Sequence, residues 1–266
     1  MTTRYQYKSL IDFVISHPLT VDGRLNDGWN AYFPVKGVEI EATILFADIS
    51  EFTRRTQELS PTETLIFANN FFSWITAEAV KDRHCIVDKY IGDEIMIIFS
   101  KEFGSDDPFV DALQCARWMS EHDALRFRPH IGIAQGLVTV GFVGTPIQYN
   151  CSVFGRAVAL AQRCTAVKPE GHYYTSIVFP ASLWGDRNFD NIFQPLKYSY
   201  SDDSEYVQPQ TWELLKPRTV LMKNMGEQQI REIVNSKFHK PMQSAESSAK
   251  NSLELLKQAG SYRPSN

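Results

Sequence analysis

The chain has 266 residues, of which 43% are hydrophobic and 12% aromatic, and this is enough for one sizeable core without demanding a second domain. Its formal net charge is −4 and its charges are interspersed, so we expect no nucleic-acid partner. No apolar stretch approaches the roughly 20 residues that span a bilayer, and the start lacks the layout of a signal peptide. We therefore expect a cytoplasmic protein without a membrane partner.

The first part of the chain predicts a helix, a loop and a central strand. Apolar residues recur at helical spacing over residues 4–17, and Pro18 ends that pattern. The glycine-containing stretch that follows predicts a loop up to residue 37. A continuous apolar and β-branched run then predicts a strand over residues 38–49 that is central in its sheet.

The next elements are a helix and a hairpin. Ser60, Pro61 and Glu63 have the spacing of an N-cap, a first-turn proline and a capping-box partner, so they predict a helix start. Two apolar runs over residues 85–99 flank the pair Gly92-Asp93. Such a pair favours a tight turn, so the segment predicts a β-hairpin.

The pattern continues with a helix over residues 108–122 and a second hairpin over residues 128–143, which we expect to turn at Gln135-Gly136. After a polar loop, a strand-like stretch leads through Gly155 into another helix that runs to residue 167. This order predicts an α+β fold, with a ferredoxin-like βαββαβ core and a mostly antiparallel sheet flanked by helices.

The composition suggests three segments. Residues 1–37 form the N-terminal helix and loop, and residues 38–235 form the folded domain. Residues 236–266 are rich in Ser, Ala, Lys, Gln and Asn. We expect a flexible tail there, although one short helix fits the pattern.

Two aspartates sit at the ends of predicted strands. Asp48 ends the strand of TILFADIS, and Asp93 lies at the tip of the first hairpin. If these strands are neighbours, the two carboxylates repel each other unless one is protonated or a cation neutralises them. Carboxylate oxygens suit Mg²⁺ or Mn²⁺, which bind few protein ligands together with substrate phosphates. The alternative is that Asp48 caps the next helix and Asp93 only fills a turn.

Several motifs in this order resemble the catalytic domain of class III nucleotidyl cyclases. They are FADISEFT, DKYIGDEIMIIF, HIGIAQGLVTVGFVG and SVFGRAVALAQRC. The resemblance runs from about residue 41 to about residue 164, and more loosely to about residue 234. It implies that residues 38–235 are the catalytic domain, working as a head-to-tail homodimer with two shared active sites.

The resemblance also implies roles for the metal half of each site. Asp48 and Asp93 bind two divalent cations, Mn²⁺ or Mg²⁺, and the carbonyl of Ile49 adds a ligand. The turn after the strand surrounds the β- and γ-phosphates of a nucleoside triphosphate. That turn consists of Ile49, Ser50, Glu51, Phe52 and Thr53. The adjacent Arg54 and Arg55 fit a solvated helix face better than a phosphate site.

The other half of the site contains the base and transition-state contacts that the resemblance implies. Lys89 faces the base with Ser152 as its partner, and Arg163 contacts the phosphates in the transition state. Lys223, in LMKNMG, resembles a weaker late motif in which a lysine touches the triphosphate.

Two positions depart from the family pattern. Adenylate cyclases usually have Asp or Thr where this chain has Ser152, and a serine hydroxyl can donate or accept a hydrogen bond. It therefore suits uracil or cytosine as well as adenine. Many relatives have Asn where this chain has Ala159, although the residues expected to bind metal and phosphate are all retained.

A small cyclase with these changes, and without attached sensor modules, resembles the pyrimidine cyclases of bacterial antiphage defence (Pycsar). That resemblance implies conversion of UTP, ahead of CTP, to a cyclic nucleotide that a separate effector protein detects. Two alternatives stay open. One is an adenylate cyclase with a relaxed base pocket, and the other is a catalytically silent dimerising module that binds nucleotide.

Overall fold

The computed structural model describes residues 6–17, 21–23, 35–123, 125–144, 149–169, 176–195, 197–199, 205–207, 209–236 and 245–258. The helices are α1 (Leu10–Ser16), α2 (Phe52–Thr56), α3 (Pro61–Trp74), α4 (Pro108–Glu121), α5 (Arg156–Thr165), α6 (Phe189–Ile192) and α7 (Ala245–Gln258), with a π-helical turn at Ile75–Ala79 and 3₁₀ turns at Lys101–Phe103 and Ala181–Leu183. The strands are β1 (Val21–Gly23), β2 (Val35–Ile49), β3 (Cys85–Ile91), β4 (Glu94–Phe99), β5 (Pro129–Gly144), β6 (Tyr149–Phe154), β7 (Ser176–Pro180), β8 (Lys197–Ser199), β9 (Glu205–Val207), β10 (Trp212–Leu214), β11 (Arg218–Met222) and β12 (Gly226–Asn235).

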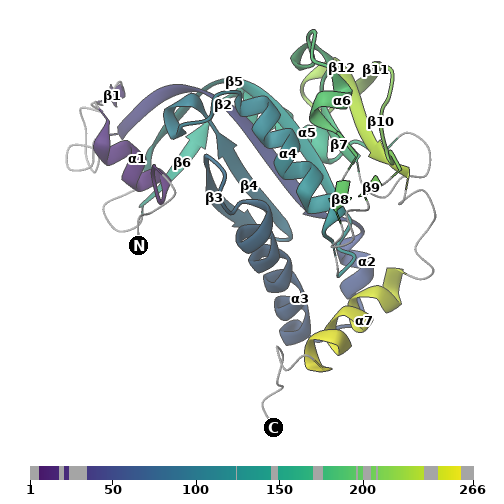
Figure 1. Ribbon diagram of the computed structural model, residues 1–266. Helices are drawn as coiled ribbons and strands as arrows, with labels where there is room; N and C mark the ends of the chain where they lie inside the picture. The colour runs from purple at the N-terminus through teal and green to yellow at the C-terminus, as the bar shows by residue number, and fades with distance from the viewer. Residues whose placement is uncertain are drawn as a thin grey trace.

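One large sheet organises the molecule (Figure 1). Its strand order is β10-β12-β7-β5-β2-β4-β3, with β1 beside β2, β6 beside β5 and β11 beside β12. The pair β5 and β7 is parallel and the other pairs are antiparallel. The segment β5-β2-β4-β3 has the strand order of a ferredoxin-like core. The predicted α+β class with a mostly antiparallel sheet is therefore confirmed.

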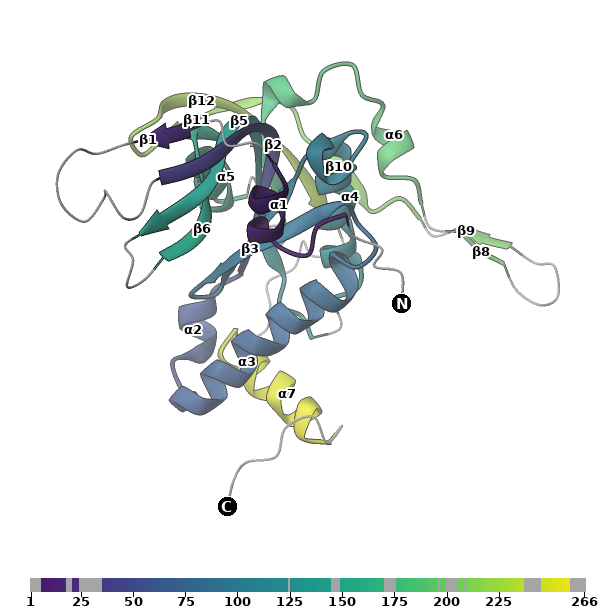
Figure 2. The ribbon, with the colours of Figure 1, turned by 90° about the vertical axis from the view of Figure 1, so that its left-hand side faces the viewer.

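Residues 42–47 of strand β2 are buried because helices cover both faces of this part of the strand. Leu45, Ala47 and Ile49 pack in the core beneath α3 and α4, while Ile44 and Phe46 pack in a second core with α1 and α5. Side chains alternate between the faces of a strand, so Asp48 points to the α5 face. Figure 2 shows the sheet between its helices from the side.

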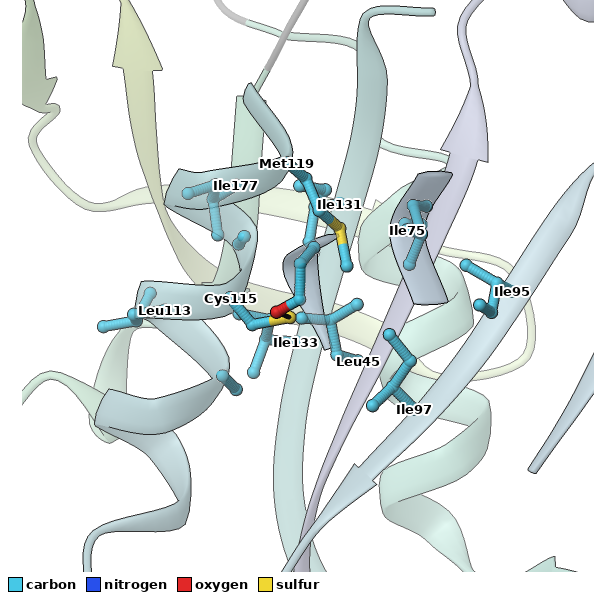
Figure 3. Packing of buried hydrophobic residues seen from close by; sticks show 14 of the residues in the cluster. Leu45, Ile75, Ile95, Ile97, Leu113, Cys115, Met119, Ile131, Ile133 and Ile177 are labelled. Atoms are coloured by element: carbon cyan, nitrogen blue, oxygen red, sulfur yellow. Dashed lines mark hydrogen bonds between the residues drawn. The ribbon is translucent and has the colours of Figure 1, made fainter. Parts of the chain in front are cut away.

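The first core combines aliphatic and aromatic side chains from several elements. Figure 3 shows Leu45, Ile97 and Ile133 from three neighbouring strands meeting Cys115 and Met119 of α4. All five are fully buried. This close packing holds the central strands together, and these strands place Asp48 near the end of β2 and Asp93 in the turn before β4.

The predicted helix start at Ser60 and the predicted hairpin at Gly92-Asp93 are confirmed. The Ser60 hydroxyl accepts from the Glu63 amide, and the Glu63 carboxylate accepts from the Ser60 amide, which is a complete capping box at the start of α3. The predicted hairpin is β3 and β4, and its turn contains Gly92 with a φ of 65°. Glycine adopts that conformation without steric cost.

The predicted turn at Gln135-Gly136 is wrong, because β5 is one continuous strand of 16 residues. Helix α5 explains the glycines of this segment. A Cβ at Gly132 would lie 2.1 Å from the carbonyl oxygen of Ala161, and one at Gly136 would lie 3.7 Å from the Cβ of Ala157. Glycine at position 132 therefore permits close helix–sheet packing, and neither glycine forms a chain reversal.

Both predicted terminal segments contribute to the domain core. Leu10, Phe13 and Val14 of α1 are buried in the second core, and the loop predicted after α1 contains β1, which extends the sheet beside β2. The expectation of a flexible tail is wrong for α7, a helix of 14 residues. Its Leu253 and Leu256 are buried in the first core, so tertiary packing stabilises a segment whose overall composition is polar. The rest of that predicted tail beyond residue 236 lies outside the described residues.

None of the helices in the described part of the chain is long and apolar enough to cross a membrane.

Candidate active site

The two aspartates predicted to bind metal lie together. Asp48 is next to last in β2, and Asp93 is in the turn that leads into β4, whose first residue Glu94 is the register partner of Asp48. The Asp48 and Asp93 carboxyl groups are close enough that a hydrogen bond and charge repulsion between them both raise the pKa of Asp48. Two carboxyl groups can form such a bond only when one of them carries a proton.

Burial is the main reason that Asp48 retains a proton. Burial, the hydrogen bond from Asp93 and the charges of Asp93 and Glu94 raise the pKa of Asp48 to about 8, although the Ile49 amide partly opposes this by donating to it. Burial also raises the pKa of Glu94, with Gln162 opposing and Asp93 adding to the shift. We define the carboxylate cluster as Asp48, Asp93 and Glu94, and none of the three forms an ion pair with a basic side chain in the described part of the chain.

The chemistry of this cluster fits divalent cations. A bound cation replaces the shared proton and relieves the repulsion between the carboxylates. No group of three or more His, Cys, Asp or Glu side chains in the described ranges is arranged to enclose a metal. The pair Asp48 and Asp93 suits Mg²⁺ or Mn²⁺, which commonly take one or two carboxylates and complete their coordination with water and phosphate oxygens.

The phosphate turn, which we define as Ile49 to Thr53, bends from β2 into α2. Glu51 has a φ of 53°, an uncommon value for a residue with a side chain. The Ser50 side chain is 1% exposed, and its hydroxyl donates to the Phe127 carbonyl at 3.3 Å. The side chains of Ile49 and Ser50 therefore face the interior, so only the backbone of these two residues is available to a ligand.

The two residues predicted to contact the base are in contact with each other. The Lys89 ammonium of β3 donates to the Ser152 hydroxyl of β6. Lys89 Nζ also lies 3.1 Å from Asp88 Oδ2. Ser152 is buried and Lys89 is half-buried, so this pair can present one donor and one rotatable hydroxyl to a planar base.

Arg163 and Lys223 line one pocket of about 350 Å³ between the end of α5 and the β11–β12 hairpin. Lys168 and Arg218 line it too, and Arg218 donates to Glu232 and to the Lys168 carbonyl. We call Arg163, Lys168 and Lys223 the basic pocket. Clustered cations around an open pocket of this size suit the charge of a triphosphate.

The structure adds two features that the sequence did not predict. Gln162 of α5 donates to Glu94 at 3.3 Å, which ties the carboxylate cluster to the helix that bears Arg163. Arg55 is 1% exposed, so the expectation of a solvated position is wrong for this residue. Its spacing from Phe52 and Leu59, which are both partly buried, is the sequence signal that could have found it.

Comparisons with known proteins agree with this geometry. The family model described as "Adenylate and Guanylate cyclase catalytic domain" matches residues 37–172, slightly more than half of the chain. An adenylate cyclase of Anabaena cylindrica is 29% identical over 137 residues, which cover 46% of this chain and 26% of that protein. A terminal-differentiation-specific adenylate cyclase of Dictyostelium discoideum is 32% identical over 132 residues, which cover 46% of this chain and 6% of that protein. The chain therefore matches only a small part of these longer relatives.

Solved structures show the same fold. The adenylyl cyclase CyaB of P. aeruginosa superimposes with a TM-score of 0.56 at 18% identity, over 77% of this chain and 99% of that one. The guanylate cyclase domain of RhGC from Catenaria anguillulae, solved in complex with GTP, gives a TM-score of 0.54 at 17% identity, over 74% and 98% of the two chains.

Proposed function

Since this chain belongs to the adenylate and guanylate cyclase catalytic domain family, we propose that it converts a pyrimidine nucleoside triphosphate, UTP ahead of CTP, to the 3′,5′-cyclic nucleotide and pyrophosphate. The observation that carries the cyclase chemistry is the close pair Asp48 and Asp93, in which burial and the neighbouring carboxyl group raise the pKa of Asp48. A scaffold gains nothing from two partly buried carboxyl groups that repel each other. A metal-dependent enzyme needs such a pair.

The chemistry is an in-line displacement. The ribose 3′-hydroxyl oxygen forms a bond to the α-phosphorus, the bond from that phosphorus to the β-phosphate oxygen breaks, and the hydroxyl proton passes to solvent. Asp48 and Asp93 would hold the divalent cations, which when bound lower the pKa of the 3′-hydroxyl and neutralise charge on the pyrophosphate.

Protein groups position the triphosphate in this proposal. Amides of the phosphate turn donate to the β- and γ-phosphates, and Arg163 donates to the phosphoryl oxygens where negative charge develops. Lys223 adds a contact to the triphosphate. The carboxylate cluster of one subunit and the basic pocket of its partner would complete each of two sites in a homodimer.

The base is selected by Lys89 and Ser152. The lysine can donate to a uracil carbonyl, and the serine hydroxyl can accept from the N3–H of that ring or donate to N3 of cytosine. Adenine is the competing base, because lysine can donate to its ring nitrogen while serine accepts from its amino group. The product would act as a second messenger that a separate effector protein detects in antiviral defence.

The test is to incubate the purified chain with ATP, GTP, CTP or UTP and Mn²⁺, and to identify cyclic products by mass spectrometry. We expect cyclic UMP to form fastest, and turnover of ATP alone would refute the pyrimidine assignment. Absence of turnover with every nucleotide would favour the silent module. Asp48→Asn is the matched control, because it removes the charge and keeps the shape.

Substrate choice has a further test in Ser152→Asp. An aspartate there accepts from the adenine amino group. It can also accept from the N3–H of uracil, but its charge repels the two carbonyl oxygens that flank this N–H. We therefore expect the ratio of kcat/KM for ATP to that for UTP to rise about tenfold, since an unfavourable polar contact at the base disfavours binding. An unchanged ratio would show that these two residues do not contact the base.

A further inference from the structure

Arg55 is a buried arginine directly after the phosphate turn. Its guanidinium donates to the carbonyls of Phe127 at 2.9 Å and Arg126 at 3.0 Å, and lies 4.9 Å from the centre of the Phe67 ring. It also reaches the Ser50 carbonyl, within the phosphate turn itself, at 3.5 Å. A guanidinium has a planar fork of donors that can satisfy several carbonyls at once.

The carbonyls that Arg55 meets belong to a loop with unusual backbone geometry. We define the docking loop as Asp123 with residues 125–128. Arg126 and Arg128 have φ values of 57° and 52°, which are uncommon for residues with side chains. The Asp123 carboxylate accepts from the amides of Phe127 at 2.8 Å and Arg128 at 2.6 Å. These bonds stabilise the loop so that its carbonyls turn toward Arg55.

Helix α7 packs against the same assembly. Ser252 donates to the Leu125 carbonyl of the docking loop at 3.0 Å, and Leu253 is buried in the first core. Both views show α7 beside α2 and α3 (Figures 1 and 2). The phosphate turn is therefore supported by segments about 70 and 200 residues further along the chain.

We infer that Arg55 is a positioning residue for the nucleotide triphosphate, because it joins the carbonyl of Ser50 in the phosphate turn to the docking loop. Ser50 makes a parallel contact, since its hydroxyl donates to the Phe127 carbonyl that Arg55 also meets. Amides act on phosphate only when they are held in place beforehand. The inference rests on the proposed function in one respect, namely that this turn binds phosphates.

A purely structural role for Arg55 is the competing explanation, and Arg117 provides the matched control. Arg117 is also nearly buried, donates to the carbonyls of Ile192 and Gln194, and lies over the Phe193 ring at 5.7 Å. It belongs to α4 and contacts no residue of the phosphate turn or docking loop in the described structure. Arg55→Lys and Arg117→Lys should therefore destabilise the fold in a comparable way.

The experiment measures melting temperature, KM and kcat for the preferred nucleotide, and the Kd of inorganic tripolyphosphate with Mn²⁺ for the wild type and both variants. We expect Arg55→Lys to raise KM and Kd about tenfold, which matches the loss of one charged hydrogen bond, with a much smaller change in kcat. Arg117→Lys should leave KM and Kd within about twofold of the wild type at a similar loss of melting temperature. Equal KM and Kd values for the two variants would overturn the inference.

Ser252→Ala keeps the test valid if Arg55→Lys does not fold, because it removes one hydroxyl and no charge. We expect it to raise KM and Kd about twofold to threefold, and values equal to those of the wild type would count against the inference. If the wild type makes no cyclic product, the proposed function fails while the Kd values still test Arg55. If the wild type does not bind tripolyphosphate with Mn²⁺, the phosphate turn is no phosphate site and the inference fails too.

Discussion

The carboxylate cluster and the basic pocket carry opposite charge, and they differ in how far their charged groups are exposed to water. Asp48 and Glu94 are partly buried among like charges, and burial raises the pKa of both. Lys168 and Lys223 are exposed around an open pocket, where water solvates their charge at little cost. The comparison teaches that the fold holds repelling carboxyl groups partly buried at the carboxylate cluster, whereas it leaves the lysines of the basic pocket exposed to water.

The two clusters do not neutralise each other within the described residues. No ion pair joins a member of the carboxylate cluster to Arg163, Lys168 or Lys223 in that part of the chain. A nucleoside triphosphate with its cations is the ligand that would satisfy both, since it brings positive charge to the carboxylates and negative charge to the pocket. Substitutions of Asp48 and Arg163 should therefore have similar effects on activity and different effects on stability.

The largest expected effect is the loss of activity in Asp48→Asn. We expect kcat/KM to fall by about a thousandfold or more, because the variant loses a metal ligand. Its melting temperature at pH 9 should equal or exceed that of the wild type, because the amide removes an ionised group from a buried like-charged site. Arg163→Ala should lose activity to a similar extent without any gain of stability. An active Asp48→Asn enzyme would refute the metal assignment.

Mixing variants from the two clusters tests whether they act in the same site. Asp93→Ala and Arg163→Ala subunits should each be inactive alone. Random pairing makes about half of the dimers mixed, each with one intact site of two, so the mixture should recover about a quarter of wild-type activity. A mixture of Asp93→Ala with Asp48→Asn is the control and should recover nothing. If mixed dimers form and the first mixture stays inactive, the shared-site proposal is refuted.

Lys223 should have a smaller effect, confined to substrate binding. We expect Lys223→Met to raise KM for the nucleotide about tenfold with kcat little changed, because the exposed ammonium contributes a charge-assisted contact to phosphate. Its melting temperature should stay within about 1 °C of the wild-type value, since surface charges contribute little to stability. Lys216→Met is a suitable control, because that exposed lysine lies outside the pocket lining. Equal KM values for the two variants would exclude Lys223 from phosphate binding.

The sequence predicted best those features that depend on neighbours in the chain. The capping box at Ser60 and the turn at Gly92 follow from local geometry, and both are present. The apolar run of β2 also predicted a central strand, and β2 lies between β5 and β4. The proximity of Asp48 and Asp93 followed from one further step, namely that strand ends in a ferredoxin-like core lie side by side.

The features that the sequence did not predict depend on contacts between distant segments. Gly136 resembles a turn residue, but it lies within the continuous strand β5, where an added Cβ would contact Ala157 of α5. Arg55 resembles a solvated residue until the carbonyls of Arg126 and Phe127, more than 70 residues away, provide partners. Helix α7 has a polar composition, yet its Leu253 and Leu256 are buried in the first core. Such contacts cannot be found from spacing along one segment.

The smallest expected effect is on the pH dependence of stability, and it isolates the carboxylate cluster. The pKa of Asp48 is about 8 in the folded chain, well above its ordinary value. The folded state therefore keeps a proton that the unfolded chain releases near pH 4, so this stabilisation is complete below about pH 4 and is lost as the pH rises to about 8. Glu94, on the neighbouring strand, shifts in the same direction.

Other groups near Asp48 must be separated from it. His130 of β5 is its register partner, and burial lowers the pKa of this imidazole to about 4, so His130 destabilises the fold only toward acidic pH. The difference between the wild type and Asp48→Asn removes this contribution.

Between pH 5 and pH 8 without divalent cations, we expect the wild type to lose about 1 kcal/mol or more of unfolding free energy relative to the variant. Urea titrations at each pH would measure it. Added Mn²⁺ should reduce the loss in the wild type and leave the variant unchanged, because a cation replaces the proton between Asp48 and Asp93. If the wild type showed the same pH profile as the variant, the repulsion between Asp48 and Asp93 would be too weak for a bound cation to stabilise the fold by relieving it.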